Sequence, residues 1–225
     1  MRGKRLVATC DRYLTALSSC CSNAIEKQIL VENPRRKAKK LTEPQGRTRF
    51  LDDQEREKLI AAYKDNSPQL HLAVVLAFGT GARRLEIWSL RWENVDLEEG
   101  YLTFQETKNG DIRSVPIIGQ ALDLLKEYHR KHHLLHISLF FPSTTNPQKP
   151  LEFRKRWESL LRQAKITDFR YHDLRHSAAS YMVRSGMDLR VVAEILGHRT
   201  LQMRMRYSHL KRDHLKSAML KAMSA

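Results

Sequence analysis

The chain has 225 residues and a formal net charge of +15, with 40 Lys and Arg residues against 25 Asp and Glu. This length suffices for one large domain, or for one domain and a fragment, and 41% hydrophobic residues suffice for a core. A positive surplus of this size favours a polyanionic partner such as DNA, RNA or an anionic membrane surface. No segment approaches the ~20 apolar residues of a membrane-spanning helix, so we expect no membrane role for this chain.

The first 49 residues carry much of this charge, with twelve Lys and Arg residues against four Asp and Glu, a net +8. Apolar positions between residues 11 and 30 predict a helix that ends before Asn33-Pro34. A basic linker at 35–49 follows, and two interpretations of it stay open: a solvated tail, or an arm that contacts nucleic-acid phosphates without reading sequence. The candidate DNA-binding residues are Arg35, Arg36, Lys37, Lys39 and Lys40.

The N-terminus and the cysteines indicate a compartment. The apolar run after Arg2 ends at Asp11, which is too short for a secretory signal. The cysteines at positions 10, 20 and 21 form no metal or redox spacing, so a reducing cytoplasm is the simplest expectation.

From residue 50 onward the sequence is mostly helical in pattern. Asp52 and Glu55 form a capping-box pattern, Gly79-Thr80-Gly81 is expected to break a buried helix, and Gly186 and Gly197 are placed as helix-ending residues. Asp188 and Thr200 are placed as N-caps. Helices are predicted at 51–63, 68–78, 83–90, 119–133, 151–164, 172–185, 188–196, 200–209 and 212–223.

One segment has the period of β-structure. Residues 101–105 and 112–116 read as strands, and Asn109-Gly110 between them is a strong signal for a hairpin turn. The expected fold class is therefore mainly α with a small antiparallel β-sheet (α+β).

Several residues, scattered along the chain, suit chemistry on a phosphodiester. Arg83 and Arg175 supply fixed positive charge for the non-bridging oxygens, and His172 lies three residues before Arg175, on the same helix face. Tyr207 offers a nucleophilic oxygen once a neighbouring histidine takes its proton. Lys108, at the hairpin tip, is a candidate donor of a proton to the departing sugar hydroxyl. Taken singly, each has an ordinary alternative: a surface ion pair, a packed histidine, a core tyrosine or a turn lysine.

The joint order of these residues resembles the tyrosine recombinase family, the phage-integrase type of site-specific recombinase. The matching segments are Thr80-Gly81-Ala82-Arg83-Arg84-Leu85-Glu86, Lys108, His172-Asp173-Leu174-Arg175-His176, Leu196-Gly197-His198 and Tyr207, and the resemblance covers about residues 50–210.

The resemblance implies a mechanism. Tyr207 attacks the scissile phosphate to give a 3′-phosphotyrosyl link, while Arg83, Arg175 and His198 hold the non-bridging oxygens. His172 assists proton transfer at the tyrosine and Lys108 is the general acid. Glu86 is a positioning residue, and His176 either supports the residues that contact the DNA or is structural. Because the arginines take the place of metal ions and the covalent intermediate stores the bond energy, no metal, ATP or other cofactor is expected.

The resemblance also implies partners: double-stranded DNA at specific recombination sites, a homotetramer on that DNA, and accessory DNA-bending proteins. The implied location is the bacterial cytoplasm, with nucleoid association. Residues 211–225 are either a segment passed to a neighbouring protomer or a helix that docks on its own core.

The front of the chain departs from the family pattern, because only some 45 residues precede the catalytic body where about a hundred are usual. We expect residues 1–34 to be the remnant of a helical core-binding (SAM-like) domain, residues 35–49 a basic linker, and residues 50–225 the catalytic domain with a C-terminal helix. Such a chain is a fragment, a degraded prophage gene or a minimal variant.

Three functional hypotheses follow. The first is a site-specific recombinase or integrase of a prophage or mobile element; the second is a DNA-binding relic that no longer recombines; the third is a nicking and closing enzyme similar to type IB topoisomerases. A histidine run at 129–136 has helical spacing, but it lacks acidic or cysteine partners nearby, so no metal site is expected there.

Overall fold

The computed structural model describes residues 2–37, 49–64, 67–105, 112–132 and 137–197. The chain divides into two compact units, Met1–Arg47 and Thr48–Ala225. Among the helices in the described ranges, none has the length and apolar character needed to cross a membrane.

The first unit is a long helix with a short helical turn folded against it. α1 (Arg2–Glu26) is followed by the 3-10 turn η1 (Pro34–Lys37), and the two elements are in contact. The buried Asn33 side chain fastens this turn, because its amide donates to the Ser18 carbonyl at 3.0 Å and its Oδ1 accepts from the Arg35 amide at 3.0 Å. The helix was predicted to run to residue 30, but Gln28 has a φ of 60°, a left-handed conformation that ends it sooner.

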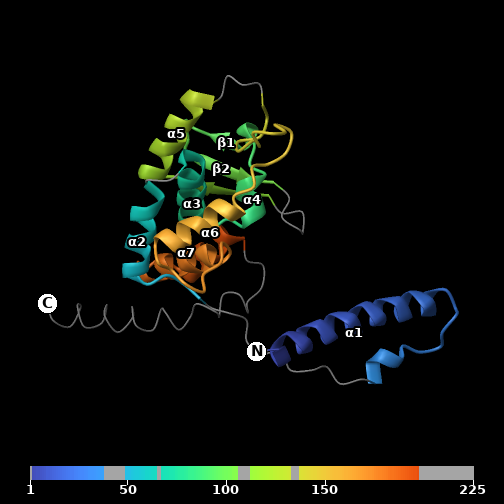
Figure 1. Cartoon of the computed structure of the whole chain (residues 1–225). Coiled ribbons are helices and arrows are strands. Elements are labelled where there is room, and N and C mark those ends of the chain that lie inside the picture. Colours follow the sequence, from blue (N-terminus) through green and yellow to red (C-terminus); the bar gives the residue numbers. More distant parts are fainter. Residues whose placement is uncertain (1, 38–48, 65–66, 106–111, 133–136, 198–225) are drawn as a thin grey trace. The chain divides into compact units, whose positions relative to one another are not determined.

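The second unit is built around α3 (Pro68–Thr80). This helix is apolar on nearly every side, so it is a buried central helix and not an amphipathic surface helix. It contacts α2 (Asp53–Lys64), α4 (Arg84–Trp88), α5 (Gln120–His132) and α7 (Asp173–Arg184), as Figure 1 shows. The other helical elements in the described ranges of this unit are η2 (Trp92–Asn94), α6 (Arg154–Gln163) and α8 (Leu189–Leu196).

Local capping explains where several of these helices begin and end. Asp52 accepts from the Glu55 amide at 2.8 Å while the Glu55 carboxylate accepts from the Asp52 amide at 3.2 Å, which confirms the predicted capping box. Asp188 caps α8 through the Arg190 amide, and Gly197 ends α8 with a φ of 64°. α3 continues through Gly79 and Thr80 and ends only at Gly81, so the predicted break was placed two residues too early.

The sheet has three antiparallel strands in the order β1 (Val95–Asp96), β2 (Tyr101–Phe104), β3 (Arg113–Pro116). Leu102 pairs with Val115 and Phe104 with Arg113. The two longer strands confirm the predicted hairpin, whereas β1 was not predicted because two residues show no periodicity. The expected turn at Asn109-Gly110 lies outside the described residues. The expected fold class, mainly helical with a small antiparallel sheet, is confirmed.

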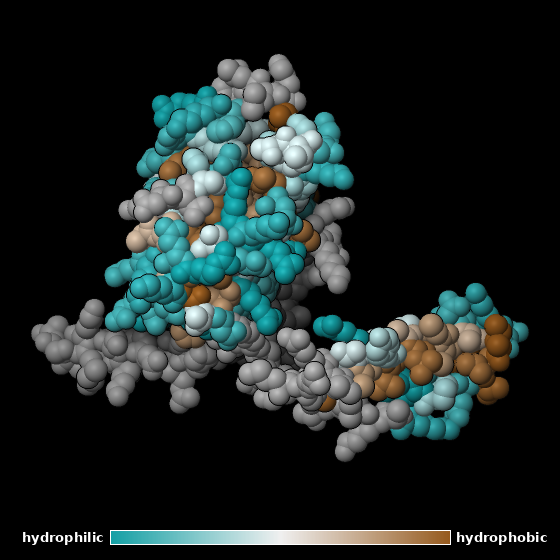
Figure 2. Space-filling view, viewed as in Figure 1, coloured by the Kyte–Doolittle hydropathy of each residue, from teal (hydrophilic) through white to brown (hydrophobic). Residues whose placement is uncertain are grey.

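The visible surface of the second unit is largely hydrophilic, with apolar side chains exposed only in small separate places (Figure 2). Phe140, Phe141 and Phe153 lie in its interior and are fully buried. Their rings pack edge to face with centroids 4.8 and 5.5 Å apart, a favourable geometry for aromatic pairs. This interior supports the helices that carry the candidate site.

Two glycines at the end of α3 allow a matched test of this packing. Gly81 has a φ of 60°, and a Cβ built there would lie 2.2 Å from Cδ2 of the fully buried Leu196. We therefore expect Gly81→Ala to lower the free energy of unfolding by about 2–4 kcal/mol, from left-handed strain and overpacking together. Urea unfolding followed by circular dichroism measures this change.

Gly79→Ala is the control, because a Cβ there meets no atom within 4 Å and the residue is helical. It should raise the free energy of unfolding by about 0.5–1 kcal/mol. Equal effects at the two glycines would contradict the contact between Gly81 and Leu196.

Candidate active site

A tight turn after α3 places Arg83. The Thr80 hydroxyl donates to the Leu76 carbonyl at 2.6 Å and accepts from the Ala82 amide at 3.2 Å. Between them Gly81 takes the left-handed conformation that ends α3. The chain therefore leaves α3 at Gly81, and Arg83 becomes the N-cap of α4.

Arg83 is held by Glu86, one turn further along α4. The Glu86 carboxylate accepts from the Arg83 backbone amide and from Arg83 Nη1, both at 2.6 Å. The Arg83 side chain nevertheless stays 40% exposed, whereas that of Glu86 is 7% exposed. The carboxylate is thus nearly buried, whereas the guanidinium that it holds is partly exposed.

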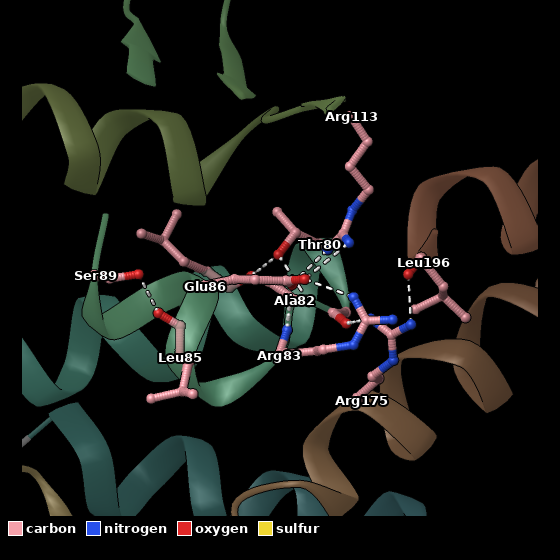
Figure 3. Close-up of polar contacts among 11 residues, drawn as sticks. Thr80, Ala82, Arg83, Leu85, Glu86, Ser89, Arg113, Arg175 and Leu196 are labelled. Atoms are coloured by element: carbon pink, nitrogen blue, oxygen red, sulfur yellow. Dashed lines mark hydrogen bonds and ion pairs between the residues drawn. The ribbon is translucent and has the colours of Figure 1, made fainter. Parts of the chain in front are cut away.

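Arg175 is a buried cation that ties two distant segments together. It lies in α7 and is 4% exposed. Its Nη1 donates to the Gly81 carbonyl at 2.7 Å and its Nη2 donates to the Leu196 carbonyl. One planar guanidinium therefore joins the turn before Arg83 to the end of α8, two residues before His198 (Figure 3).

The histidines of α7 lie beside this arginine in the sequence but differ in exposure. His172 is the N-cap of α7 and is exposed, while His176 is buried. Their rings meet edge to face with centroids 5.4 Å apart. An exposed imidazole at the start of the helix that carries Arg175 is suited to exchange protons with a bound substrate.

Tyr171 provides a useful contrast with the proposed nucleophile. Its hydroxyl donates to the Ala73 carbonyl at 3.2 Å within the core. Burial raises the pKa of Tyr171, and the charge of Arg84 offsets only part of this rise. A buried, engaged phenol of this kind is not suited to attack a phosphate.

Arg113 is a member of the site that the sequence analysis missed. It lies in β3, and its Nη1 and Nη2 donate to the two oxygens of Glu86 at 3.1 and 2.7 Å. Figure 3 shows Arg113 and Arg83 meeting at Glu86, with Arg175 next to them. The available signal was strand alternation, because Arg113 lies on the same strand face as the buried Val115 and a charge there needs a partner.

Glu86 remains ionised in this setting. Burial alone would raise the pKa of its carboxyl, but the hydrogen bonds and charge of Arg113 and the hydrogen bonds of Arg83 outweigh burial and lower the pKa. A carboxylate whose two oxygens accept four hydrogen bonds is suited to hold arginines in place and not to act as a general base.

The structure thus brings together part of the predicted site. Arg83 and Arg175 are connected through Gly81, and His172 begins the helix that carries Arg175. Lys108, His198 and Tyr207 lie outside the described residues, as do Lys39 and Lys40. In the first unit, η1 contains Arg35, Arg36 and Lys37. Lys37 makes an exposed ion pair with Glu32 at 2.5 Å.

The histidine run at 129–136 is described only in part. His129 packs edge-on against Trp92, and His132 stacks on Tyr128 with centroids 4.0 Å apart. Within the described ranges no group of three or more His, Cys, Asp or Glu side chains is placed to hold a metal ion.

The segments that form this arrangement all lie within the match to one protein family. The phage integrase family matches residues 49–214, which include all the segments of the site. The chain belongs to the phage integrase family. This match covers the turn at Gly81, the arginine of α7 and the end of α8 described above.

Individual relatives agree with this assignment. A shufflon-specific DNA recombinase of Escherichia coli is 31% identical over 212 residues, covering 93% of this chain and 53% of that protein. The chain therefore spans about half the length of this relative. The catalytic domain of bacteriophage HP1 integrase is 29% identical with a TM-score of 0.58, covering 76% of this chain and 92% of that domain. A XerH site-specific recombinase, solved bound to a palindromic difH substrate, is 25% identical with a TM-score of 0.62. The match covers 76% of this chain and 52% of that protein.

The lowered pKa of Glu86 predicts how stability depends on pH. The stabilisation present above the ordinary value of 4.5 is lost as the pH falls through the lower pKa of the folded state. We expect the free energy of unfolding of the wild type to fall more steeply below about pH 5 than that of Glu86→Gln, so that the difference between them narrows. Urea unfolding across the acid range measures this difference.

Glu98→Gln removes an exposed carboxylate of the same type and serves as the control. Its stability should follow that of the wild type at each pH. A difference between wild type and Glu86→Gln that stays constant through the acid range would contradict the ion pairs of Glu86.

Proposed function

We propose that this chain cuts and rejoins DNA at specific sites, with the Tyr207 hydroxyl as nucleophile and a 3′-phosphotyrosyl intermediate. The observation that carries this proposal is the double hydrogen bond of Arg175. It fixes the segment that presents Arg83 against the segment that leads into His198. The Arg175 guanidinium carries five N–H donors, more than these two carbonyls accept, so it and the neighbouring Arg83 together suit the two non-bridging oxygens of one phosphate.

The proposed roles follow the chemistry of each group. Arg83, Arg175 and His198 bind the phosphate oxygens and stabilise the charge that develops during attack. His172 takes up the proton of the Tyr207 hydroxyl, and Lys108 donates a proton to the leaving 5′-oxygen. The partial exposure of Arg83 and the exposure of His172 support this assignment, because both side chains are accessible from solvent.

The proposed partner is double-stranded DNA carrying a specific recombination site. The net charge of +15 supports it, and the related XerH recombinase was solved bound to its difH substrate. On that DNA we propose a homotetramer assisted by DNA-bending proteins, acting in the cytoplasm close to the nucleoid. Residues 50–225 are the proposed catalytic domain, residues 35–49 the basic linker and residues 1–34 the remnant of a core-binding domain.

The nucleophile is tested with a nicked suicide DNA that carries a candidate attachment site. The wild type should form a covalent protein–DNA band on a denaturing gel, and Tyr207→Phe should remove that band, because phenylalanine has no hydroxyl to attack the phosphorus. Tyr171→Phe is the matched control, since the Tyr171 hydroxyl is engaged inside the core, and it should keep the band.

Three outcomes contradict the proposal. A covalent band that survives Tyr207→Phe would remove Tyr207 as the nucleophile. Specific DNA binding without any band would indicate a relic. Relaxation of supercoiled plasmid independent of any site would indicate a topoisomerase-like enzyme.

The basic segment is tested through the salt dependence of binding. Replacing Arg35, Arg36, Lys37, Lys39 and Lys40 by alanine should reduce the slope of log K against log salt by about 0.9 for each phosphate contact that is lost. Fluorescence anisotropy with a labelled duplex measures the slope.

The control for general charge loss is alanine at Lys126, Arg130 and Lys131 of α5. An equal change in slope per removed charge in both variants would contradict a specific phosphate-binding role for the basic linker.

A further inference from the structure

Arg113 connects three segments of the site, and the proposed mechanism gives it no role. It lies in β3, five residues after Lys108 in the sequence. Its guanidinium binds Glu86 of α4, and it lies against Gly197 at the end of α8. The interaction with Glu86 is a two-pronged ion pair, the geometry that fixes a carboxylate in both position and orientation.

We propose that Arg113 is a positioning residue for DNA cleavage, holding Glu86 so that Arg83 presents its charge to the scissile phosphate. This inference rests on the proposed function. Arg113 acts from behind the site, because its side chain is 9% exposed while that of Arg83 is 40% exposed. Both terminal nitrogens of Arg113 are engaged by Glu86, and its guanidinium carbon lies 4.8 Å from the centroid of the Phe104 ring.

The charges explain why Glu86 needs a second arginine. Shared between Arg83 and Arg113, the carboxylate neutralises only one of two positive charges. Without Arg113, Glu86 would pair with Arg83 alone, and the Arg83 guanidinium would approach the phosphate with its charge already compensated. Arg113 therefore preserves one net positive charge where the phosphate binds.

The contact with Gly197 extends this effect to the end of α8. A Cβ at Gly197 would lie 2.9 Å from Arg113 Nη1 and 3.2 Å from its Cδ, and Gly197 has a φ of 64°. The glycine thus lets the guanidinium lie directly against the backbone at the end of α8. Leu196, the preceding residue, is held by Arg175, so two arginines fix the same turn.

The test measures DNA affinity and single-turnover cleavage separately, on the suicide DNA described above. In Arg113→Met we expect cleavage to fall by about 100-fold, the cost of misplacing a group that binds the reacting phosphate. DNA affinity should change by less than about threefold, because a side chain that Glu86 occupies makes no phosphate contact. Arg113→Lys, which keeps the charge but loses the two-pronged geometry, should fall between Arg113→Met and the wild type.

The double variant Arg113→Met/Glu86→Gln tests whether Arg113 acts through Glu86. It restores the net charge that Arg113→Met removes, so it should cleave no more slowly than Arg113→Met alone. Arg184→Met is the matched control, because it also removes an arginine from an ion pair, with Asp53 at 3.5 Å, and it should cleave as the wild type does. Circular dichroism at the assay temperature establishes that each variant is folded.

Three results would each overturn the inference. The first is a wild-type cleavage rate in Arg113→Met, and the second is a loss of DNA affinity in Arg113→Met as large as its loss of cleavage. The third is a cleavage rate in the double variant that is lower than in Arg113→Met by the further factor that Glu86→Gln causes alone. If the wild type itself forms no covalent band, the proposed function fails, and the position of Arg83 is then read from its side-chain Nε–H signal in NMR spectra of the free protein. Arg113→Met should shift this signal strongly and Arg184→Met should not. An unchanged Arg83 signal in Arg113→Met would overturn the role of Arg113 independently.

Discussion

The site depends on one buried guanidinium, that of Arg175, which joins the Gly81 and Leu196 carbonyls. These acceptors are far apart in the sequence, and only the packing of α7 against both α3 and α8 brings them to one side chain. A hydrogen bond to a charged group contributes about 1.5–3 kcal/mol, so neither segment moves freely while Arg175 stays in place. The tight contact between Gly81 and Leu196 follows from the same closeness.

Around this cation the electrostatics are arranged by Glu86. Its carboxylate accepts from Arg83 and Arg113 together, and it is nearly inaccessible to solvent. Two like charges at this distance repel each other, and the carboxylate between Arg83 and Arg113 offsets that repulsion. The positive charge therefore stays concentrated at the site. Family membership and this geometry both agree with the proposed chemistry on a phosphodiester.

Much of the fold was open to prediction because its signals are local. The capping residues Asp52 and Asp188 and the terminating glycine Gly197 act within one turn of chain, and all three have the predicted role. Errors arose where the deciding factor is weak or non-local. α3 continues past Gly79 because Gly81, and not Gly79, takes the left-handed conformation that ends the helix, and β1 is too short to show a period.

The same difference between local and long-range signals decided which residues of the site could be predicted. Spacing along the chain indicated Arg83, His172 and Arg175, because their motifs have a fixed order. Spacing did not reveal Arg113, since its partner Glu86 lies 27 residues away and only the folded sheet brings them together. Nor did it show that Arg175 binds backbone carbonyls, because every peptide unit offers the same acceptor.

The proposed site directs arginine charge at the charge of one scissile phosphate. The most direct measurement compares the cleavage rates of wild type and Arg83→Ala on DNA with an ordinary scissile phosphate and on DNA with an uncharged methylphosphonate at that position. We expect Arg83→Ala to slow cleavage severely on the phosphate and far less on the methylphosphonate, because the neutral linkage no longer needs the guanidinium. An equal penalty on both substrates would contradict it.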